Sequence, residues 1–376
     1  MSSNITQVVL FGSFVSHLSN HQFRVLLRAI GNLPRLNSLQ LVNFDHHTPL
    51  TVEDLSYLLE IANVQNNLRE LALTGGVHLV DLANDPRPRQ IFLEYPLSNL
   101  RVLKSLSLAH VTLESTEEEE GTRRINLDQS QLDPLMERLP QLIPSLEQLS
   151  IRLRHRRMHL SGPNPLNPIS LLAPSTLEGL LISKGMSHNN LTVLKLFQMD
   201  LDNERLCTIA ESLQSNNTLK ELLLQGRRSD IQPHKISSDA CASLTKMIRL
   251  NKTLERFHLR GVQISDDHAM SLAQSLEHNL TMAFLRLDYP SPGPNNSHQP
   301  LLNAKKYRLI MNYYLKLNRS GVRLFVHQLY SQPSAVSAIG AINTLLEHWT
   351  DVVAGTDLDC VFYVLSNCPF IIFQYQ

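Results

Sequence analysis

Aromatic residues and net charge are both scarce in this sequence of 376 residues. Aromatic side chains make up 6%, and 34 basic residues balance 34 acidic ones, so the formal net charge is zero. A protein that binds nucleic acid mainly through bulk charge is usually more basic, and we therefore expect no nucleic-acid partner. The hydrophobic fraction of 43% is nevertheless large enough to form a sizeable core, which excludes a disordered chain.

The sequence also lacks the segments that direct a protein into or across a membrane. Residues 1–10 contain no basic stretch, and the apolar residues that follow are interrupted by Ser13 and Ser16. No uninterrupted apolar run approaches the roughly 20 residues needed to span a bilayer. No Cys-x-x-Cys pair occurs, because the four cysteines are widely spaced at Cys207, Cys241, Cys360 and Cys368. We expect a protein of the cytoplasm or nucleus with reduced cysteines and no membrane partner.

Motifs for catalysis and cofactor binding are missing as well. There is no GxxxxGK[ST] phosphate-binding loop, no HExxH and no GxSxG, and no spacing of Ser, His and Asp singles out a triad. Asp45, His46 and His47 are candidate metal ligands, but adjacent residues seldom point at one ion, and a loop explains them equally well. We therefore expect no enzyme activity, no catalytic residue, no cofactor and no metal.

Leucine, by contrast, is over-used and recurs in a fixed pattern. Segments 191–196, 219–224, 254–259 and 282–287 fit L-x-x-L-x-L or a close variant of it. The spacing is 28 residues from Leu191 to Leu219 and again from Leu254 to Met282, while an insertion around Arg227–Lys235 lengthens the unit between them. The last three positions alternate as in a strand with one buried face. Looser copies begin at Ile5, Leu36, Leu68, Leu103 and Leu146, which predicts eight or nine strands.

A second pattern follows each strand copy and predicts an α-helix. Apolar residues spaced i, i+3, i+4 and i+7 lie on one helical face. Five segments show this spacing or most of it, beginning at Phe23, Leu55, Leu206, Cys241 and Ala269. Ser265, followed by two aspartates, is the expected N-cap of the last one. One strand and one helix cannot bury both apolar faces alone, but stacked copies can.

The repeat resembles the leucine-rich-repeat proteins of the ribonuclease-inhibitor-like subtype, whose units of about 28 residues contain full helices. The resemblance covers roughly residues 1–288 and implies an α/β leucine-rich-repeat solenoid with a parallel inner sheet and outer helices. Residues 289–300 are rich in Pro and Asn and predict a linker. The period disappears in residues 301–376, where we expect an α-helical C-terminal cap over the core of the last repeat.

Two positions of the repeat have unusual residues. The family pattern places Asn or Cys three residues after the last strand leucine. This sequence has apolar residues there instead, at Phe44, Val111, Met199 and Val262, which predicts apolar and irregular turns. Asn-x-Ser/Thr triplets occur at equivalent repeat positions, beginning at Asn190, Asn216, Asn251 and Asn279. Their recurrence indicates a structural role.

The candidate binding surface is the set of strand residues that alternate with the core leucines and point into the concave face. Early strands offer small neutral residues there: Gln40, Ala72, Thr74, Ser107 and Ala109. Later strands carry charge and rings: Arg152, Lys195, Phe197, His258, Arg260, Phe284 and Arg286. Arginine and aromatic residues are enriched at interface hot spots, although inner-face residues can also be simply solvated. We predict a non-enzymatic interaction scaffold that holds a locally acidic protein partner against the later strands.

Alternatives remain for function and for the charged segments. The repeat subtype includes activators of a nuclear-transport GTPase, so a GTPase-activating protein for a small GTPase is one alternative, although no catalytic Arg or Asn loop is evident. The substrate-receptor arm of a ubiquitin ligase is another, although residues 1–30 leave no room for an adaptor-binding domain. The basic run 152–159 either binds a ligand or pairs with the acidic loop 114–120. The sequence leaves the oligomeric state open.

Overall fold

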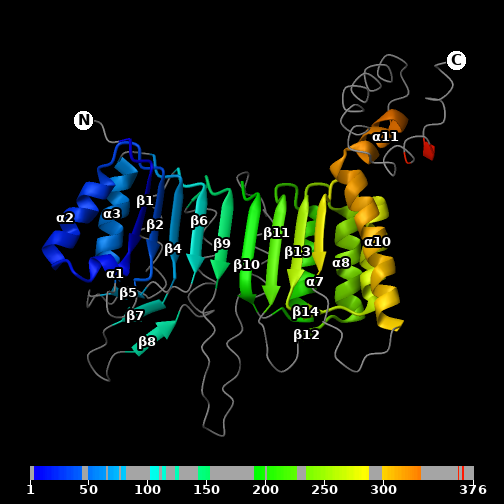
Figure 1. Ribbon diagram of the computed structural model, residues 1–376, viewed down its shortest axis with the longest axis horizontal. Coiled ribbons are helices and arrows are strands. Elements are labelled where there is room, and N and C mark those ends of the chain that lie inside the picture. The colour runs from blue at the N-terminus through cyan, green and yellow to red at the C-terminus, as the bar shows by residue number, and fades with distance from the viewer. Residues whose placement is uncertain are drawn as a thin grey trace, which may run out of the picture.

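The central element of the fold is a sheet of parallel strands, and helices pack along it (Figure 1). The computed structural model describes residues 4–44, 50–64, 67–75, 78–81, 102–109, 112–115, 123–126, 143–152, 190–199, 201–226, 234–287, 299–331, 363, 366 and 367. Within this part the main sheet has nine strands. In order across the sheet they are β1 (Gln7–Phe11), β2 (Ser38–Val42), β4 (Glu70–Thr74), β6 (Ser105–Ala109), β9 (Gln148–Arg152), β10 (Val193–Met199), β11 (Glu221–Gly226), β13 (Arg256–Arg260) and β15 (Phe284–Leu287).

Each strand pairs in parallel with the next copy of itself, and the register aligns the repeat leucines. Leu41 lies beside Leu73, and Leu224 lies beside Leu259, so each core position forms a continuous row across the sheet. These residues are fully buried, as the L-x-x-L-x-L pattern predicts. Ile5 is the exception: we expected it in the core, but it is exposed, because β1 is the edge strand of the described sheet.

Helices cover one face of this sheet. They are α1 (Gly12–Val15), α2 (Asn20–Gly31), α3 (Val52–Val64), α7 (Asn203–Ser215), α8 (Ser238–Leu250) and α9 (Asp266–Ser275), followed by the 3-10 turn η2 (Leu276–His278). The predicted apolar stripes are buried in one core with the strand leucines. The helices begin at side-chain caps: Asp202, Ser237 and Ser265 each accept a hydrogen bond from a backbone N–H three residues on. The expected N-cap at Ser265 is therefore confirmed.

Two helices follow the last strand. Helix α10 (Gln299–Arg319) packs against α9, and α11 (Val322–Ser331) follows it after one tight turn. Tyr307, Met311 and Leu315 of α10 are buried in the same core as the repeats. Helix α10 begins two residues before the expected start of the cap, and the rest of the expected linker lies outside the described residues. Residues 332–376 do as well, apart from Tyr363, Ser366 and Asn367, so the domain division stays a prediction.

Short additional strands replace the irregular turns that the apolar turn residues predicted. Strands β3 (Leu50–Thr51), β5 (His78–Asp81), β7 (Thr112–Ser115) and β8 (Arg123–Asn126) form a second sheet, and β12 (His234–Lys235) pairs with β14 (Val262–Gln263). The turn residues Phe44, Met199 and Val262 are buried, as expected, whereas Val111 lies outside the described residues. Apolar turns thus still permit backbone pairing between neighbouring repeats.

The recurrent asparagines join one repeat to the next. The Asn251 side-chain oxygen accepts hydrogen bonds from the backbone N–H groups of Thr253 and Leu254, at 2.9 and 2.7 Å. Its amide nitrogen donates to the carbonyl oxygens of Leu213 and Asn216 in the preceding repeat, at 2.6 and 3.1 Å. The side-chain amide nitrogens of Asn279 and Asn318 likewise each donate two hydrogen bonds to backbone carbonyl oxygens earlier in the chain. We call Asn251, Asn279 and Asn318 the asparagine ladder.

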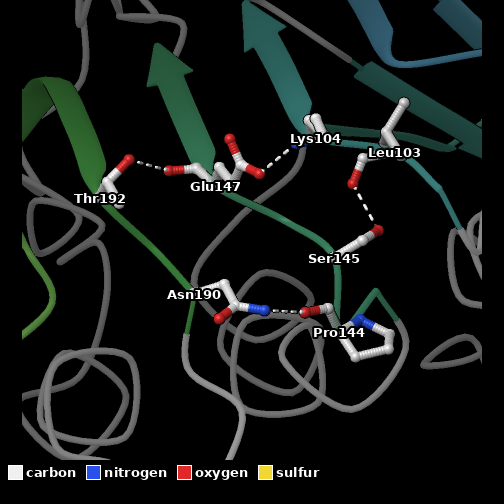
Figure 2. Close-up of polar contacts among 7 residues, drawn as sticks. All are labelled: Leu103, Lys104, Pro144, Ser145, Glu147, Asn190 and Thr192. Atoms are coloured by element: carbon white, nitrogen blue, oxygen red, sulfur yellow. Dashed lines mark hydrogen bonds and ion pairs between the residues drawn. The ribbon is translucent and has the colours of Figure 1, made fainter.

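Earlier repeats have a sparser form of these contacts (Figure 2). Asn190 donates to the carbonyl oxygen of Pro144 at 3.0 Å, and the Ser145 hydroxyl donates to the carbonyl oxygen of Leu103 at 2.7 Å. Asn190 is exposed, whereas the ladder residues Asn251 and Asn279 are each only 2% exposed. The recurrence of Asn-x-Ser/Thr triplets therefore has a structural explanation, as the sequence indicated.

The chain leaves several strands through a left-handed residue. Asn43, Gly75, Gln198 and Gly261 have φ between 56° and 76° directly after, or in a bulge at the end of, their strands. Gly261 also packs against the backbone of Gly226 in the neighbouring repeat. A Cβ atom on Gly261 would lie 2.9 Å from the Gly226 carbonyl oxygen, which is too close for a real contact.

We therefore expect Gly261→Ala to lower the free energy of unfolding by about 1–2 kcal/mol, since it combines a left-handed backbone with a clash against backbone atoms. Urea denaturation measures this loss. Gly321→Ala is the matched control: φ is +71° there, but a Cβ would meet no atom within 4 Å. It should cost about 1 kcal/mol or less. Equal losses in the two variants would contradict a role for the glycine–glycine contact.

Candidate functional site

The face of the main sheet opposite the helices carries the side chains that alternate with the buried leucines. A solenoid with outer helices turns this face into its concavity. We call it the open face. Strand register arranges its residues in rows, and one row runs through Gln40, Ala72, Ser107, Ser150, Lys195, Leu223, His258 and Arg286. The row is neutral up to Ser150, as predicted, and charged residues appear from Lys195 onward.

The structure brings the predicted site residues together on four strands and reveals further members. The register places Arg152 beside Phe197, His258 beside Arg286, and Arg256 beside Glu221. We call six side chains of this surface the cationic patch: Arg152, Lys195, Arg256, His258, Arg260 and Arg286. Sequence reasoning missed Arg256 and Glu221, which are the first residues of their strands. Extending the alternation back by two positions from Leu223 and His258 finds both.

One carboxylate lies within this surface. Glu221 contacts the Lys195 ammonium at 3.0 Å and the Arg256 guanidinium at 4.0 Å. It is the only acidic residue among the described open-face positions of β9 to β15. Arg260 and Arg286 lie on adjacent strands. Neither has an ion-pair partner among the described residues. The patch therefore carries more positive charge than its single carboxylate balances.

Both aromatic rings of the surface lie against a basic side chain. The Arg152 guanidinium carbon is 4.6 Å from the centroid of the Phe197 ring, a cation–π contact. The ring of His258 stacks on Phe284 with the centroids 4.7 Å apart. These contacts hold the basic groups in fixed positions on the sheet, because each is supported by a neighbouring strand.

His258 lies at the centre of the patch and has a lowered pKa. Burial is the largest cause, and the nearby charge of Arg260 is the next; Arg286 and Lys195 act in the same direction, and Glu221 opposes them. The Nδ1 atom of His258 and the Nε atom of Arg260 are buried without a hydrogen-bond partner among the described residues. The site thus combines positive potential with unused polar groups.

Other predicted features lie at the margin of the described residues. Asp45, His46 and His47 fall outside them, and no group of three or more His, Cys, Asp or Glu within the described part could hold a metal. Only Arg152 of the basic run 152–159 is described, so its pairing with the acidic loop stays a prediction. Lys104 forms an ion pair with Glu147 just before β6 and β9 (Figure 2).

The described cysteines and helices offer no further site. Cys241 is buried, and its burial raises the pKa of the thiol against a smaller opposing effect of Thr245, so it remains a protonated core residue. Cys207 is half-buried, and neither forms a disulfide. Across the described helices, no stretch has the length and hydropathy of a membrane span.

Comparison with known proteins adds little to this geometry. No family model and no curated protein matches the chain. Among solved structures, leiomodin-1 actin-binding site 2 is similar with 19% identity and a TM-score of 0.29, over 42% of this chain and 80% of that one. A Bacteroides fragilis protein has 14% identity and a TM-score of 0.37, over 73% and 74%. The class therefore rests on the described residues themselves: an α/β protein with a parallel sheet and outer helices, consistent with a leucine-rich-repeat-like solenoid.

Proposed function

We propose that this protein is a non-enzymatic interaction scaffold that binds a protein partner on the later strands of its open face. The observation that supports this most is the cationic patch, in which five side chains and His258 face one carboxylate. Arginine and aromatic side chains held on a rigid sheet are the residue types of interface hot spots. The complementary partner presents an acidic segment, and the steering effect of opposite charge speeds its association.

The same proposal includes the finer features of the fold. We assign the chain to the ribonuclease-inhibitor-like subtype because α7, α8 and α9 are full helices between parallel strands. We assign residues 301–376 to a C-terminal cap because α10 buries Tyr307 and Met311 against the last repeat. A cytoplasmic or nuclear location remains part of the proposal. No feature of the described residues favours GTPase activation or a ubiquitin-ligase role.

The test removes Arg260 and Arg286, which have no ion-pair partner within the described part of the chain. We expect Arg260→Ala combined with Arg286→Ala to weaken partner binding by at least about tenfold, since each loses a charge-assisted contact. The melting temperature should stay the same, because neither side chain pairs with a described residue. Affinity purification with mass spectrometry identifies the partner, and titration calorimetry with the purified partner measures the loss.

Gln40→Ala combined with Ser107→Ala is the matched control, since these residues occupy the same row as Arg286 on the neutral strands. This variant should retain every partner of the wild type. A partner that binds the arginine variant with unchanged affinity would contradict the placement of the site.

A further inference from the structure

His258 has basic side chains beside it on its own strand and on β15, and a carboxylate on β11. Its own strand, β13, places Arg256 and Arg260 on either side of it, and Arg286 of β15 is its register partner. On the other side, β11 contributes Glu221, Leu223 and Gln225, and Lys195 follows on β10. Its ring is fixed against Phe284. Among the described residues, the charged groups that face it are therefore Arg256, Arg260, Arg286, Lys195 and Glu221, of which Glu221 alone is acidic.

This arrangement disfavours the charged imidazolium in the free protein. Burial and the neighbouring cations lower the pKa of His258, as described above. Because the unfolded chain then binds more protons than the folded one, acidification through this range costs the free protein stability. An anionic ligand that neutralises Arg260 and Arg286 reverses the local potential, so His258 gains a proton as the ligand binds.

The spacing of Arg260 and Arg286 fits an extended peptide. Arg260 and Arg286 lie on adjacent strands and are offset by two residues in the register. Adjacent strands are about 4.8 Å apart, and residues two apart along a strand are about 6.6 Å apart. The diagonal separation of Arg260 and Arg286 is therefore about 8 Å, and long arginine side chains can bridge the difference to acidic side chains about 6.6 Å apart at alternate positions of an extended peptide. Gln225, the register partner of Arg260, adds an amide that can pair with peptide backbone.

The same surface is poorly suited to nucleic acid. Binding of single strands relies on bases that stack on exposed aromatic faces. Here Arg152 occupies one face of the Phe197 ring and His258 one face of the Phe284 ring, so each ring, although Phe284 is 38% exposed, has at most one face left for a base. Glu221 within the patch also repels a phosphate backbone. A peptide that presents a few carboxylates at fixed spacing satisfies the patch better than a uniform chain of phosphates.

We propose that the cationic patch binds an extended acidic peptide segment whose carboxylates contact Arg260 and Arg286, and that His258 takes up a proton as the segment binds. This inference rests on the proposed function and names both the partner chemistry and its regulation. Its consequence is an affinity that rises as the pH falls. By linkage, any rise in the pKa of His258 on binding appears as an affinity that increases on acidification.

The experiment titrates the full-length protein with a fluorescent peptide of alternating Glu and Ser, followed by anisotropy at constant ionic strength. We expect the affinity to increase severalfold from pH 8.0 to pH 5.5, a range in which glutamate stays ionised. His258→Gln should bind with the wild-type affinity of pH 8.0 throughout. His258→Lys should bind tightly at both pH values, because its charge is permanent. The control His278→Gln changes an exposed histidine of η2 and should keep the wild-type pH dependence.

Three outcomes would overturn the inference. A pH dependence that persists in His258→Gln would show that His258 is not the group that takes up the proton. Tighter binding of an oligouridylate of equal charge would assign the patch to nucleic acid. Failure of the wild type to bind the peptide at any pH would exclude acidic segments as ligands. In the last case a partner that still depends on Arg260 and Arg286 would leave the proposed function intact, so the two proposals fail separately.

Discussion

Replacing Asn251 with alanine is expected to lower the free energy of unfolding by about 3 kcal/mol, because it removes four hydrogen bonds to backbone groups, two of which are buried. The Asn251 side chain is only 2% exposed. Its oxygen caps two N–H groups at the start of β13, and its nitrogen caps two carbonyl groups at the end of α7. The bonds to Leu213 and Leu254 are buried, so their loss costs close to the full desolvation penalty, whereas the Asn216 carbonyl keeps a hydrogen bond from the Thr253 hydroxyl.

Urea denaturation of Asn251→Ala and two companion variants measures the effect. Asn251→Asp retains the accepting oxygen but directs a second carboxylate oxygen at two carbonyl oxygens, so it should be no more stable than the alanine variant. Asn190→Ala removes the corresponding exposed asparagine, which donates one bond, and should cost about 1 kcal/mol or less. Equal losses at positions 190 and 251 would show that the ladder contributes no more than a surface contact.

Arg323→Met is expected to cost about 3 kcal/mol as well, by removing the main polar link between α11 and the last repeat. Arg323 is 3% exposed. Its Nη1 atom lies 2.8 Å from the carbonyl oxygens of Leu276 and Asn279 and 3.0 Å from the Asn318 side-chain oxygen. The carbonyl dipoles at the end of η2 thereby compensate a buried charge.

Hydrogen exchange localises this loss. We expect the amides of α10 and α11 to exchange faster in Arg323→Met, while those of β1 and β2 stay unchanged, because a solenoid repeat contacts only its neighbours. Arg323→Lys restores the charge but offers a single nitrogen, so it should recover less than half of the stability. Arg319→Ala removes an exposed arginine of α10 and is the control. Uniform acceleration along the whole chain would contradict a local role.

The strands and helices could be predicted from sequence because each repeat copies the same two periodicities. A single leucine position is ambiguous, but Leu194, Leu222, Phe257 and Leu285 share one register row, and the agreement of several copies fixes the face that is buried. Burial at the edge of the sheet was harder to predict. Ile5 fits the pattern, yet it is exposed, because β1 lies at the edge of the described sheet.

The site could be outlined but not completed in the same way. Alternation with core residues placed His258 and Arg286 on one face, which the register confirms. It could not show that Glu221 pairs with Lys195 and that Arg260 has no counterion among the residues the structure describes, because rotamers decide that pairing. Arg323 was missed altogether, because an arginine in an apolar helix carries no signal that it caps carbonyls far back in the sequence.

The asparagine ladder has a consequence for carbohydrate attachment. Asn251 and Asn279 each begin a triplet that an oligosaccharyltransferase accepts in an extended chain. In the folded protein their amide nitrogens each donate two hydrogen bonds inside the stack, where a sugar has no room. A glycan at either residue would keep two neighbouring repeats apart. Both asparagines are therefore unglycosylated in the folded protein, whichever compartment the chain has passed through.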